Sequence, residues 1–293
     1  MENEGALQDN LVREPRRPAA WLLLFALLGG NVALAIGPWF VRVADTGPVA
    51  AGFWRLFLAL PFMVLLARAN GQRLTGMPAK TLALVALGAV TFALDLASWH
   101  IGIEMTRIGN AGSIVLLFWG FIMARNLPGR LEWLAIIFAL SGAAILMGRS
   151  LEISHETLIG DLFSVAAGLL YAVYLLTLQN ARSAFGSWSL LVWVSIFGAP
   201  VLLVIALLLG EPVWPTHWGP VVGLFVLSQL VGQGLMVFAL RYFPPLVVGL
   251  ALLTQPVVAS LYGWLAFGEV LSGMDIVGMM LVGAALAVSR AKA

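Results

Sequence analysis

The sequence predicts an all-α membrane protein with ten transmembrane helices in two inverted five-helix repeats. Three observations lead to this prediction: the composition, the length of the apolar segments and an internal repeat. Of the 293 residues, 61% are hydrophobic and 10% are charged, and the mean hydropathy is +0.98. Soluble domains carry charge on about a quarter of their residues. Apolar segments of about 20 residues are long enough to cross a bilayer as helices rather than as barrel strands.

The apolar segments follow one another with short connections and leave no room for a soluble domain. Residues 1–18 are polar and mixed in charge, which predicts a disordered cytoplasmic tail and not a cleavable signal peptide. The first repeat is expected over residues 19–149 and the second over 150–293. The expected spans are 19–41, 48–67, 81–103, 107–124, 131–148, 158–179, 188–209, 218–240, 245–266 and 273–289.

The distribution of basic residues predicts the orientation in the membrane. With Lys and Arg assigned to alternate sides, three fall opposite the N-terminus, namely Arg42, Arg107 and Arg149. Because basic residues concentrate on the cytoplasmic side, both termini are expected in the cytoplasm, in the cytoplasmic (inner) membrane of the cell. Twelve lie on the side of the N-terminus: Arg13, Arg16, Arg17, Arg68, Arg73, Lys80, Arg125, Arg130, Arg182, Arg241, Arg290 and Lys292.

A short repeat relates the fifth and tenth expected spans. The segment LSGAAILMGR, residues 140–149, matches LVGAALAVSR, residues 281–290, at five of ten positions and an offset of 141. Because a five-span unit contains an odd number of spans, its second copy enters the membrane in the opposite orientation. Inverted repeats are typical of secondary transporters, which bind substrate near the middle of the membrane between the repeats.

Asp95 lies inside the third expected span and is the first candidate for a functional residue. Nine helical residues separate it from the predicted outer end, which places it about 13 Å deep. Arg55 in the second span is expected at about 10 Å, so the two should lie near each other. Trp99 shares the Asp95 face of the helix, whereas His100 is rotated away. The alternatives are a substrate site with His100 near its external mouth, or a structural ion pair with His100 at the membrane interface.

Other polar and aromatic residues lie at depths where a site is expected. Trp119 is deep in the fourth span, and Gln229 and Gln233 share a face of the eighth. For each, interhelical packing or hydrogen bonding is the alternative to substrate contact. Bends at Gly29, Gly30 and Pro256 would provide hinges. The predicted substrate-binding residues are Asn31, Arg55, Asp95, Trp99, His100, Trp119, Tyr171, Tyr174, Gln233 and Gln255.

Several function classes find no support in the sequence. There is no cysteine, which excludes thiolate metal sites and thiol nucleophiles. Metal-binding His motifs, phosphate-binding glycine loops and serine nucleophile elbows are missing, so no catalytic residue, metal or cofactor is expected. The net charge of +2 comes from residues at helix ends, so nucleic acid is not an expected partner. The expected partners are a small molecule and the lipid bilayer, and a monomer is compatible with both.

Motifs across the chain resemble the drug/metabolite transporter superfamily, in particular proteins with two EamA domains. The second half carries ALRYFPP at residues 239–245, a mid-helix Gln255-Pro256 and a Gly268-Glu269 connector, and GDLFSVAAGLLYAVYLL at 160–176 resembles the start of the second domain. The first copy departs from the pattern, with Trp119-Gly120 in place of Gln255-Pro256. The resemblance implies ten helices in two inverted repeats. Within the superfamily the chain looks most like aromatic amino acid exporters.

The predicted function is therefore export of aromatic amino acids and related small metabolites by alternating access. Aromatic side chains near a polar site suit such substrates. One alternative is efflux of cationic drugs, which an Asp95 left uncompensated by Arg55 would favour. A less favoured alternative is an intramembrane enzyme, which would need Asp95 and His100 on one face. Proton coupling and facilitated diffusion both remain compatible with the sequence.

Overall fold

The computed structural model describes residues 18–105, 129–148, 155–182, 184–267 and 270–290. In these ranges the chain forms helices joined by short connections, without strands, as predicted. The first half contains α2 (Ala20–Ala35), α3 (Gly37–Val43), α4 (Pro48–Ala69), α5 (Ala79–Met105) and α7 (Arg130–Gly148). The second half contains α8 (His155–Arg182), α9 (Ser187–Leu208), α10 (Trp218–Gly223), the π-helix η1 (Leu224–Gln233), α11 (Gly234–Ala239), α12 (Pro245–Leu252), α13 (Thr254–Phe267) and α14 (Gly273–Arg290).

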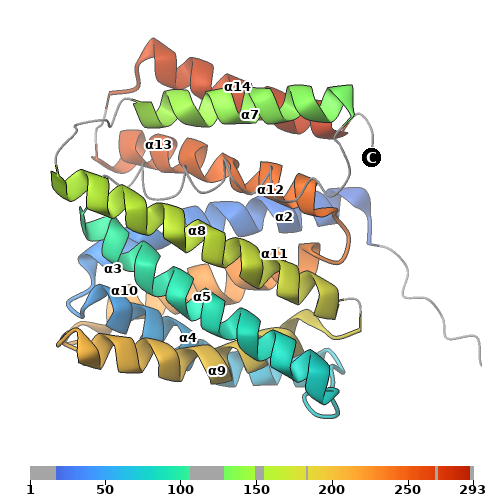
Figure 1. The fold of residues 1–293 in the computed structure, drawn as a ribbon, viewed down its shortest axis with the longest axis vertical. Helices are drawn as coiled ribbons and strands as arrows, with labels where there is room; N and C mark the ends of the chain where they lie inside the picture. Colours follow the sequence, from blue (N-terminus) through green and yellow to red (C-terminus); the bar gives the residue numbers. More distant parts are fainter. Residues whose placement is uncertain (1–17, 106–128, 149–154, 183, 268–269, 291–293) are drawn as a thin grey trace, which may run out of the picture.

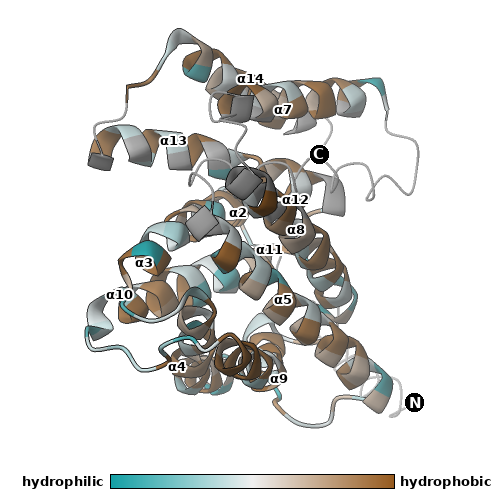
Figure 2. Cartoon of the chain, turned by 60° about the vertical axis from the view of Figure 1, so that its left-hand side comes forward, coloured by the Kyte–Doolittle hydropathy of each residue, from teal (hydrophilic) through white to brown (hydrophobic). Residues whose placement is uncertain are grey.

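These helices coincide with nine of the ten expected spans, while the fourth, 107–124, lies outside the described residues together with Trp119. Large apolar side chains face outward, for example Leu65 at 65% and Leu208 at 81% exposure, as expected for a surface in lipid. Figure 2 shows α4, α5 and α9 hydrophobic along most of their lengths. Five segments of the described chain are long and apolar enough to cross a membrane: Ala20–Val43, Pro48–Ala69, Ala79–Gly102, Ser187–Leu208 and Trp218–Ala239.

Three of the spans are irregular helices, of which the eighth is π-helical in its middle, at η1. The first breaks at Ile36, between α2 and α3, because Pro38 has no N–H to continue the helical hydrogen bonds. The expectation of a bend at Gly29 and Gly30 was wrong, since α2 runs unbroken through both. Gly30 serves packing instead: a Cβ there would lie 3.1 Å from the carbonyl oxygen of Gly232 in η1. The ninth span breaks between α12 and α13, just before Pro256, where a bend was expected.

Two helix pairs occupy opposite ends of the molecule, α7 with α14 and α4 with α9 (Figure 1). Between them, α5 packs on α8, and α2 packs on η1 and α11. The α4, α5, α8 and η1 helices surround the interior region in which the buried polar residues gather.

Two reciprocal contacts fasten the ends of α4 and α9. The turn after α9 places the Glu211 carboxylate on the N-terminus of α4, where it accepts hydrogen bonds from the N–H groups of Val49 (3.3 Å) and Ala50 (2.8 Å). The turn after α4 places Gln72 on the N-terminus of α9, where its Oε1 accepts the N–H of Ser189 at 3.1 Å. Because each N-terminus meets the turn that follows the other helix, α4 and α9 are antiparallel.

Two tryptophan side chains form a second pair of reciprocal contacts, one from α4 and one from α9. Trp54 of α4 donates from Nε1 to the carbonyl oxygen of Val213 at 2.6 Å, and Trp193 of α9 donates to that of Leu74 at 2.9 Å. Trp193 lies 139 positions after Trp54, Val213 lies 139 positions after Leu74, and the two capping side chains differ by the same offset. Replacing each residue by its equivalent in the other half of the chain therefore converts one contact into the other.

A glycine precedes each capping residue in the same conformation. Gly71 has φ 64° and Gly210 has φ 69°. This left-handed region favours glycine because a Cβ there is strained. The turn geometry that directs Gln72 and Glu211 onto the helix ends thus depends on these two positions.

Removing either cap should destabilise the fold by about 1 kcal/mol, the usual contribution of a helix N-terminal acceptor. We expect Glu211→Ala and Gln72→Ala to lower the midpoint of denaturant-induced unfolding, while Glu211→Gln keeps most of the stability because Gln72 does the same task with an amide. Arg73→Ala is the matched control, since its side chain is exposed. Equal stability of Glu211→Ala and wild type would contradict a capping role.

On the same side as Glu211, Asp45 ties the α3–α4 connection to the α9–α10 connection. Its carboxylate accepts a hydrogen bond from the Thr216 hydroxyl and, at 2.9 Å each, from the N–H groups of Thr216 and His217. Chiefly the Thr216 hydroxyl lowers the pKa of Asp45 to about 2. The carboxylate therefore stays ionised at physiological pH, and the stability it contributes declines only as the pH falls below about 3.8, the ordinary pKa of an aspartate.

The α7–α14 pair packs through two glycines. A Cβ at Gly142 would lie 2.6 Å from the carbonyl oxygen of Gly278, and one at Gly278 would lie 3.0 Å from that of Gly142. Val282 flanks the first position and Leu146 the second, so the contact is symmetric between the helices. The symmetric residues are 136 positions apart, not the 141 of the sequence match. Small residues at such crossings allow close approach of membrane helices.

Candidate functional site

Six polar side chains form a cluster in the interior, here called the central polar cluster. They come from α4, α5, α8 and η1, and therefore from both halves of the chain. Five of them are at most 7% exposed, and Tyr171 is half-buried. The cluster consists of Arg55, Asp95, Tyr171, Tyr174, Gln229 and Gln233.

Arg55 is held in the cluster by η1 and by an aromatic ring. Its Nε donates to Oε1 of Gln229 at 3.0 Å, and its guanidinium carbon lies 5.9 Å from the centre of the Phe92 ring. The bond occupies the amide oxygen of Gln229 and leaves its Nε2, which is buried and has no hydrogen-bond partner among the described residues. A buried donor without a partner costs about 1–3 kcal/mol, so it calls for an explanation.

Asp95 interacts electrostatically with Arg55, as their predicted depths suggested. The two do not form the direct ion pair considered above, because within the described residues no nitrogen of Arg55 lies within 4.0 Å of the Asp95 carboxylate. Asp95 is 7% exposed, and the described part of the chain provides its oxygens with no hydrogen bond. An acidic and a basic side chain thus lie in one buried region without direct contact.

Two tyrosines of α8 are joined through one glutamine. Tyr174 donates its O–H to Oε1 of Gln233, and Nε2 of Gln233 donates to the hydroxyl oxygen of Tyr171, each at 3.3 Å. The Tyr174 ring stacks on Phe92, with 4.3 Å between centroids. This arrangement uses the O–H of Tyr174 and leaves the proton of Tyr171 to donate to a further group.

Trp99 and His100 are positioned differently, as their rotation on α5 predicted. Trp99 is half-buried beside the α2–α3 break, where its ring would lie 3.5 Å from a Cβ at Gly37. The alternative of an exposed His100 at the membrane interface was wrong, because the side chain is 0% exposed, whereas a position near an external opening stays a prediction. Its Nδ1 hydrogen-bonds the carbonyl oxygen of Pro48 at 2.7 Å, and Gly52 leaves space for the ring. His100 therefore ties α5 to the start of α4.

Asn31 and Gln255 meet each other across the two broken spans. Gln255 donates from Nε2 to Oδ1 of Asn31 at 3.2 Å, and Asn31 donates to the carbonyl oxygen of Leu27 at 2.8 Å. This bond joins α2 to α13 beside the break that precedes Pro256. Their part in substrate binding stays a prediction, as does that of Trp119, which lies outside the described residues.

Sequence reasoning missed three residues of the interior. Gln229 had a signal, because it shares a face with Gln233, but it was not placed among the site residues. Phe92 had none, being one of 16 phenylalanines. Ser228 is buried beside Gly37 with no partner for its hydroxyl among the described residues, and a lone serine in an apolar span is too common to single out.

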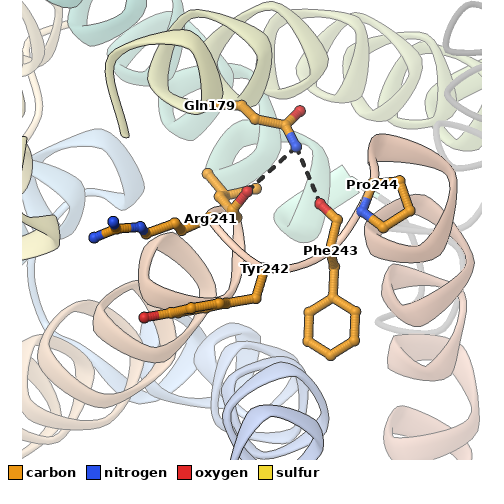
Figure 3. A pocket seen from close by; sticks show the side chains of 6 residues that line it. Gln179, Arg241, Tyr242, Phe243 and Pro244 are labelled. Carbon is orange, nitrogen blue, oxygen red and sulfur yellow. Dashed lines mark hydrogen bonds between the residues drawn. The ribbon is translucent and has the colours of Figure 1, made fainter. Parts of the chain in front are cut away.

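A cavity of about 460 Å³ lies elsewhere, at the turn between α11 and α12. Figure 3 shows Gln179 of α8 above this turn, donating to the carbonyl oxygens of Leu240 (3.3 Å) and Phe243 (3.1 Å). Arg241 and Tyr242 extend along one side of it. None of the predicted site residues lines this cavity, and in the described ranges no group of three or more His, Cys, Asp or Glu side chains could hold a metal ion.

Comparison with known proteins shows which transporters the chain resembles. Residues 158–290 match the EamA-like transporter family. The threonine/homoserine exporter RhtA of Salmonella typhimurium (strain SL1344) is 25% identical over 275 residues, which cover 92% of each chain. The second half of the chain thus matches a transporter family, and nearly the whole chain resembles an exporter of the drug/metabolite transporter superfamily. The RhtA of Escherichia coli (strain K12) is 24% identical to this transporter over 269 residues and 90% of each chain.

Two further comparisons extend the likeness of this transporter. An uncharacterized transporter of Archaeoglobus fulgidus is 26% identical over 276 residues, which cover 92% of this chain and 95% of the other. A crystal structure with 18% identity matches with a TM-score of 0.71 over 93% of this chain and 97% of the other, which supports the fold alone. These relatives do not support the expected aromatic specificity, and the resemblance to aromatic amino acid exporters stays a prediction.

Proposed function

We propose that this transporter exports small neutral amino acids across the cytoplasmic membrane. The observation that carries the proposal is the pair of opposite charges in the central polar cluster, Arg55 and Asp95, buried and without direct contact in the described structure. Buried ionisable residues in membrane spans usually serve transport or have a partner. An amino acid carries both charges and would supply both partners. The threonine/homoserine exporters among the relatives favour a small substrate over an aromatic one.

The aromatic residues of the site also favour a small substrate over an aromatic one. Phe92 and Tyr174 stack on each other at 4.3 Å, so these two ring faces are not open to a substrate ring. A cationic drug is also less favoured, because the charge of Asp95 is partly compensated by its interaction with Arg55. A small substrate with both charges fits these contacts better than either alternative.

Alternating access between two inverted repeats, 19–149 and 150–293, is the mechanism we propose. The antiparallel α4–α9 pair with its reciprocal caps and the symmetric Gly142–Gly278 contact support this division. The central polar cluster lies between the halves, where transporters of this plan bind substrate. The orientation with both termini in the cytoplasm and the absence of catalytic chemistry belong to the same proposal.

The test is counterflow of labelled threonine, homoserine, tryptophan and a cationic dye in proteoliposomes. We expect saturable threonine flux, and Asp95→Asn should lower its kcat/KM about tenfold, the effect of one charged hydrogen bond. Asp45→Asn is the matched control, because Asp45 lies in the α3–α4 connection outside the central polar cluster, so its substitution should affect stability rather than flux. Flux of the dye alone, or of tryptophan but not threonine, would overturn the proposed substrate class. Comparison with and without a pH gradient distinguishes proton coupling from facilitated diffusion.

A further inference from the structure

The hydrogen-bonding groups that remain available in the central polar cluster are donors on Arg55 and Gln229 and acceptors on Asp95. Gln229 is 0% exposed, and its Nε2 has no partner among the described residues. The side chain of Arg55 makes one hydrogen bond in the described structure, from Nε, so its Nη groups remain as donors. Asp95 contributes only acceptors and also lacks a described hydrogen bond.

We propose, on the basis of the proposed function, that Arg55 and Gln229 together bind the α-carboxylate of the substrate and that Asp95 binds its α-ammonium group. The site would then select free amino acids by their two charges and would reject substrates in which either charge is blocked.

The carboxylate half of the site follows from the Arg55–Gln229 bond. Because Nε of Arg55 donates to Oε1 of Gln229, the amide is oriented with its N–H₂ group beside the guanidinium. Guanidinium N–H groups match the geometry of a carboxylate. The guanidinium carbon also lies over the Phe92 ring, 5.9 Å from its centre, which favours a positive charge there. The unpartnered amide of Gln229 is thereby explained as a donor to the ligand.

The ammonium half follows from the separation of the charges. Asp95 interacts with Arg55 electrostatically but not through an ion pair within 4.0 Å among the described residues. An amino acid has its ammonium and carboxylate groups on the same carbon, so one molecule placed between the two side chains satisfies both. A simple anion would leave Asp95 unpaired, and a simple cation would leave Arg55 and Gln229 unpaired.

The π-helix η1 is what presents Gln229. Runs of π-helix are rare and occur frequently at functional sites. Here η1 extends over Leu224–Gln233 and carries both Gln229, which contacts Arg55, and Gln233, which contacts the tyrosines. Its wider winding is therefore located where the ligand groups are needed.

The experiment measures binding to the purified full chain in nanodiscs by calorimetry, with L-threonine, L-threonine methyl ester and N-acetyl-L-threonine as probes. The ester lacks the negative charge and the N-acetyl derivative lacks the positive one. Wild type should bind threonine at least about tenfold more tightly than either derivative, as expected when a charged hydrogen bond is lost. Equal affinity for all three would overturn the two-charge assignment.

Two substitutions test the carboxylate-binding and the ammonium-binding groups of the site separately. Gln229→Glu keeps an acceptor for Arg55 but places a negative charge against the ligand carboxylate, so it should lose threonine affinity at least about tenfold and prefer the methyl ester. Asp95→Asn should lose the discrimination against N-acetyl-L-threonine and keep that against the ester. Unchanged preferences in both variants would contradict the assignment, and a thermal melting temperature near that of wild type shows that each variant is folded.

Failure of the inference and failure of the proposed function give different results. If no amino acid binds or is transported, the proposed function is wrong. If threonine and its two derivatives bind and are transported equally, the protein is an amino acid exporter whose recognition does not use Arg55, Gln229 and Asp95 in these roles.

Discussion

Arg55→Ala should abolish threonine transport, with a loss of at least about 100-fold in kcat/KM, because a charged partner of the substrate is removed and Asp95 is left buried without a compensating charge. The substitution also leaves the buried Oε1 of Gln229 without the donor that it now bonds, at a cost of about 1–3 kcal/mol, so the variant should unfold at lower denaturant concentration. Arg55→Lys should recover the stability better than the transport. A lysine keeps the positive charge but lacks the planar arrangement of N–H donors that Gln229 and a carboxylate use.

The matched control for this prediction is Arg68→Ala, the same substitution at the exposed end of the same helix. It should leave both transport in proteoliposomes and the unfolding midpoint close to those of wild type. If Arg55→Ala transported threonine at the wild-type rate, the central polar cluster would be a structural feature and not the binding site.

The sequence was informative about where each helix begins and ends and less so about rotation around each helix. Hydropathy and the positions of charged residues located nine described spans to within a few residues at each end. The depth of Asp95 and Arg55 followed from a helical rise of about 1.5 Å per residue. The family, too, could be recognised from motifs such as Gln255-Pro256. These properties depend on one helix at a time, and local sequence contains the relevant information.

Contacts between spans could not be predicted because they depend on how each helix is turned toward its neighbours. His100 illustrates this: its position on α5 excluded the face of Asp95 but did not show that Pro48 and Gly52 of α4 would receive the imidazole. Gln229 is similar, since only the packing of α4 on η1 brings its amide to Arg55. The π-helical winding of η1 has no motif of its own.

The internal repeat could be detected in the sequence, but its exact offset depends on contacts between helices. A ten-residue match suggested an offset of 141, whereas the paired caps and tryptophans give 139 and the Gly142–Gly278 contact gives 136. Matches among small apolar residues shift easily, because Gly and Ala recur every few positions in membrane helices. Hydrogen bonds that recur in reciprocal positions are stricter evidence. They relate residues such as Gln72 and Glu211, whose identities differ and which sequence comparison alone would not align.

Gly142→Ala should separate α7 from α14 and destabilise the protein by about 1–3 kcal/mol, the usual effect of overpacking. The added Cβ would lie 2.6 Å from the backbone carbonyl oxygen of Gly278 and 2.9 Å from the Val282 side chain. A backbone atom cannot move aside as the end of a flexible side chain can, so the helices themselves must shift. Denaturant titration in detergent, followed by circular dichroism, measures the loss.

Gly283→Ala is the control that separates packing from helix propensity. Nothing lies within 4 Å of a Cβ at Gly283, so this substitution should be neutral or should stabilise by up to about 1 kcal/mol, the helix preference of alanine over glycine. The contrast is informative because the ten-residue sequence match aligns Gly142 with Gly283, whereas the structure pairs Gly142 with Gly278. If the two alanine variants lost stability equally, the α7–α14 contact through Gly142 and Gly278 would be wrong, and the repeat equivalence at this end of the molecule would return to the offset of the sequence match.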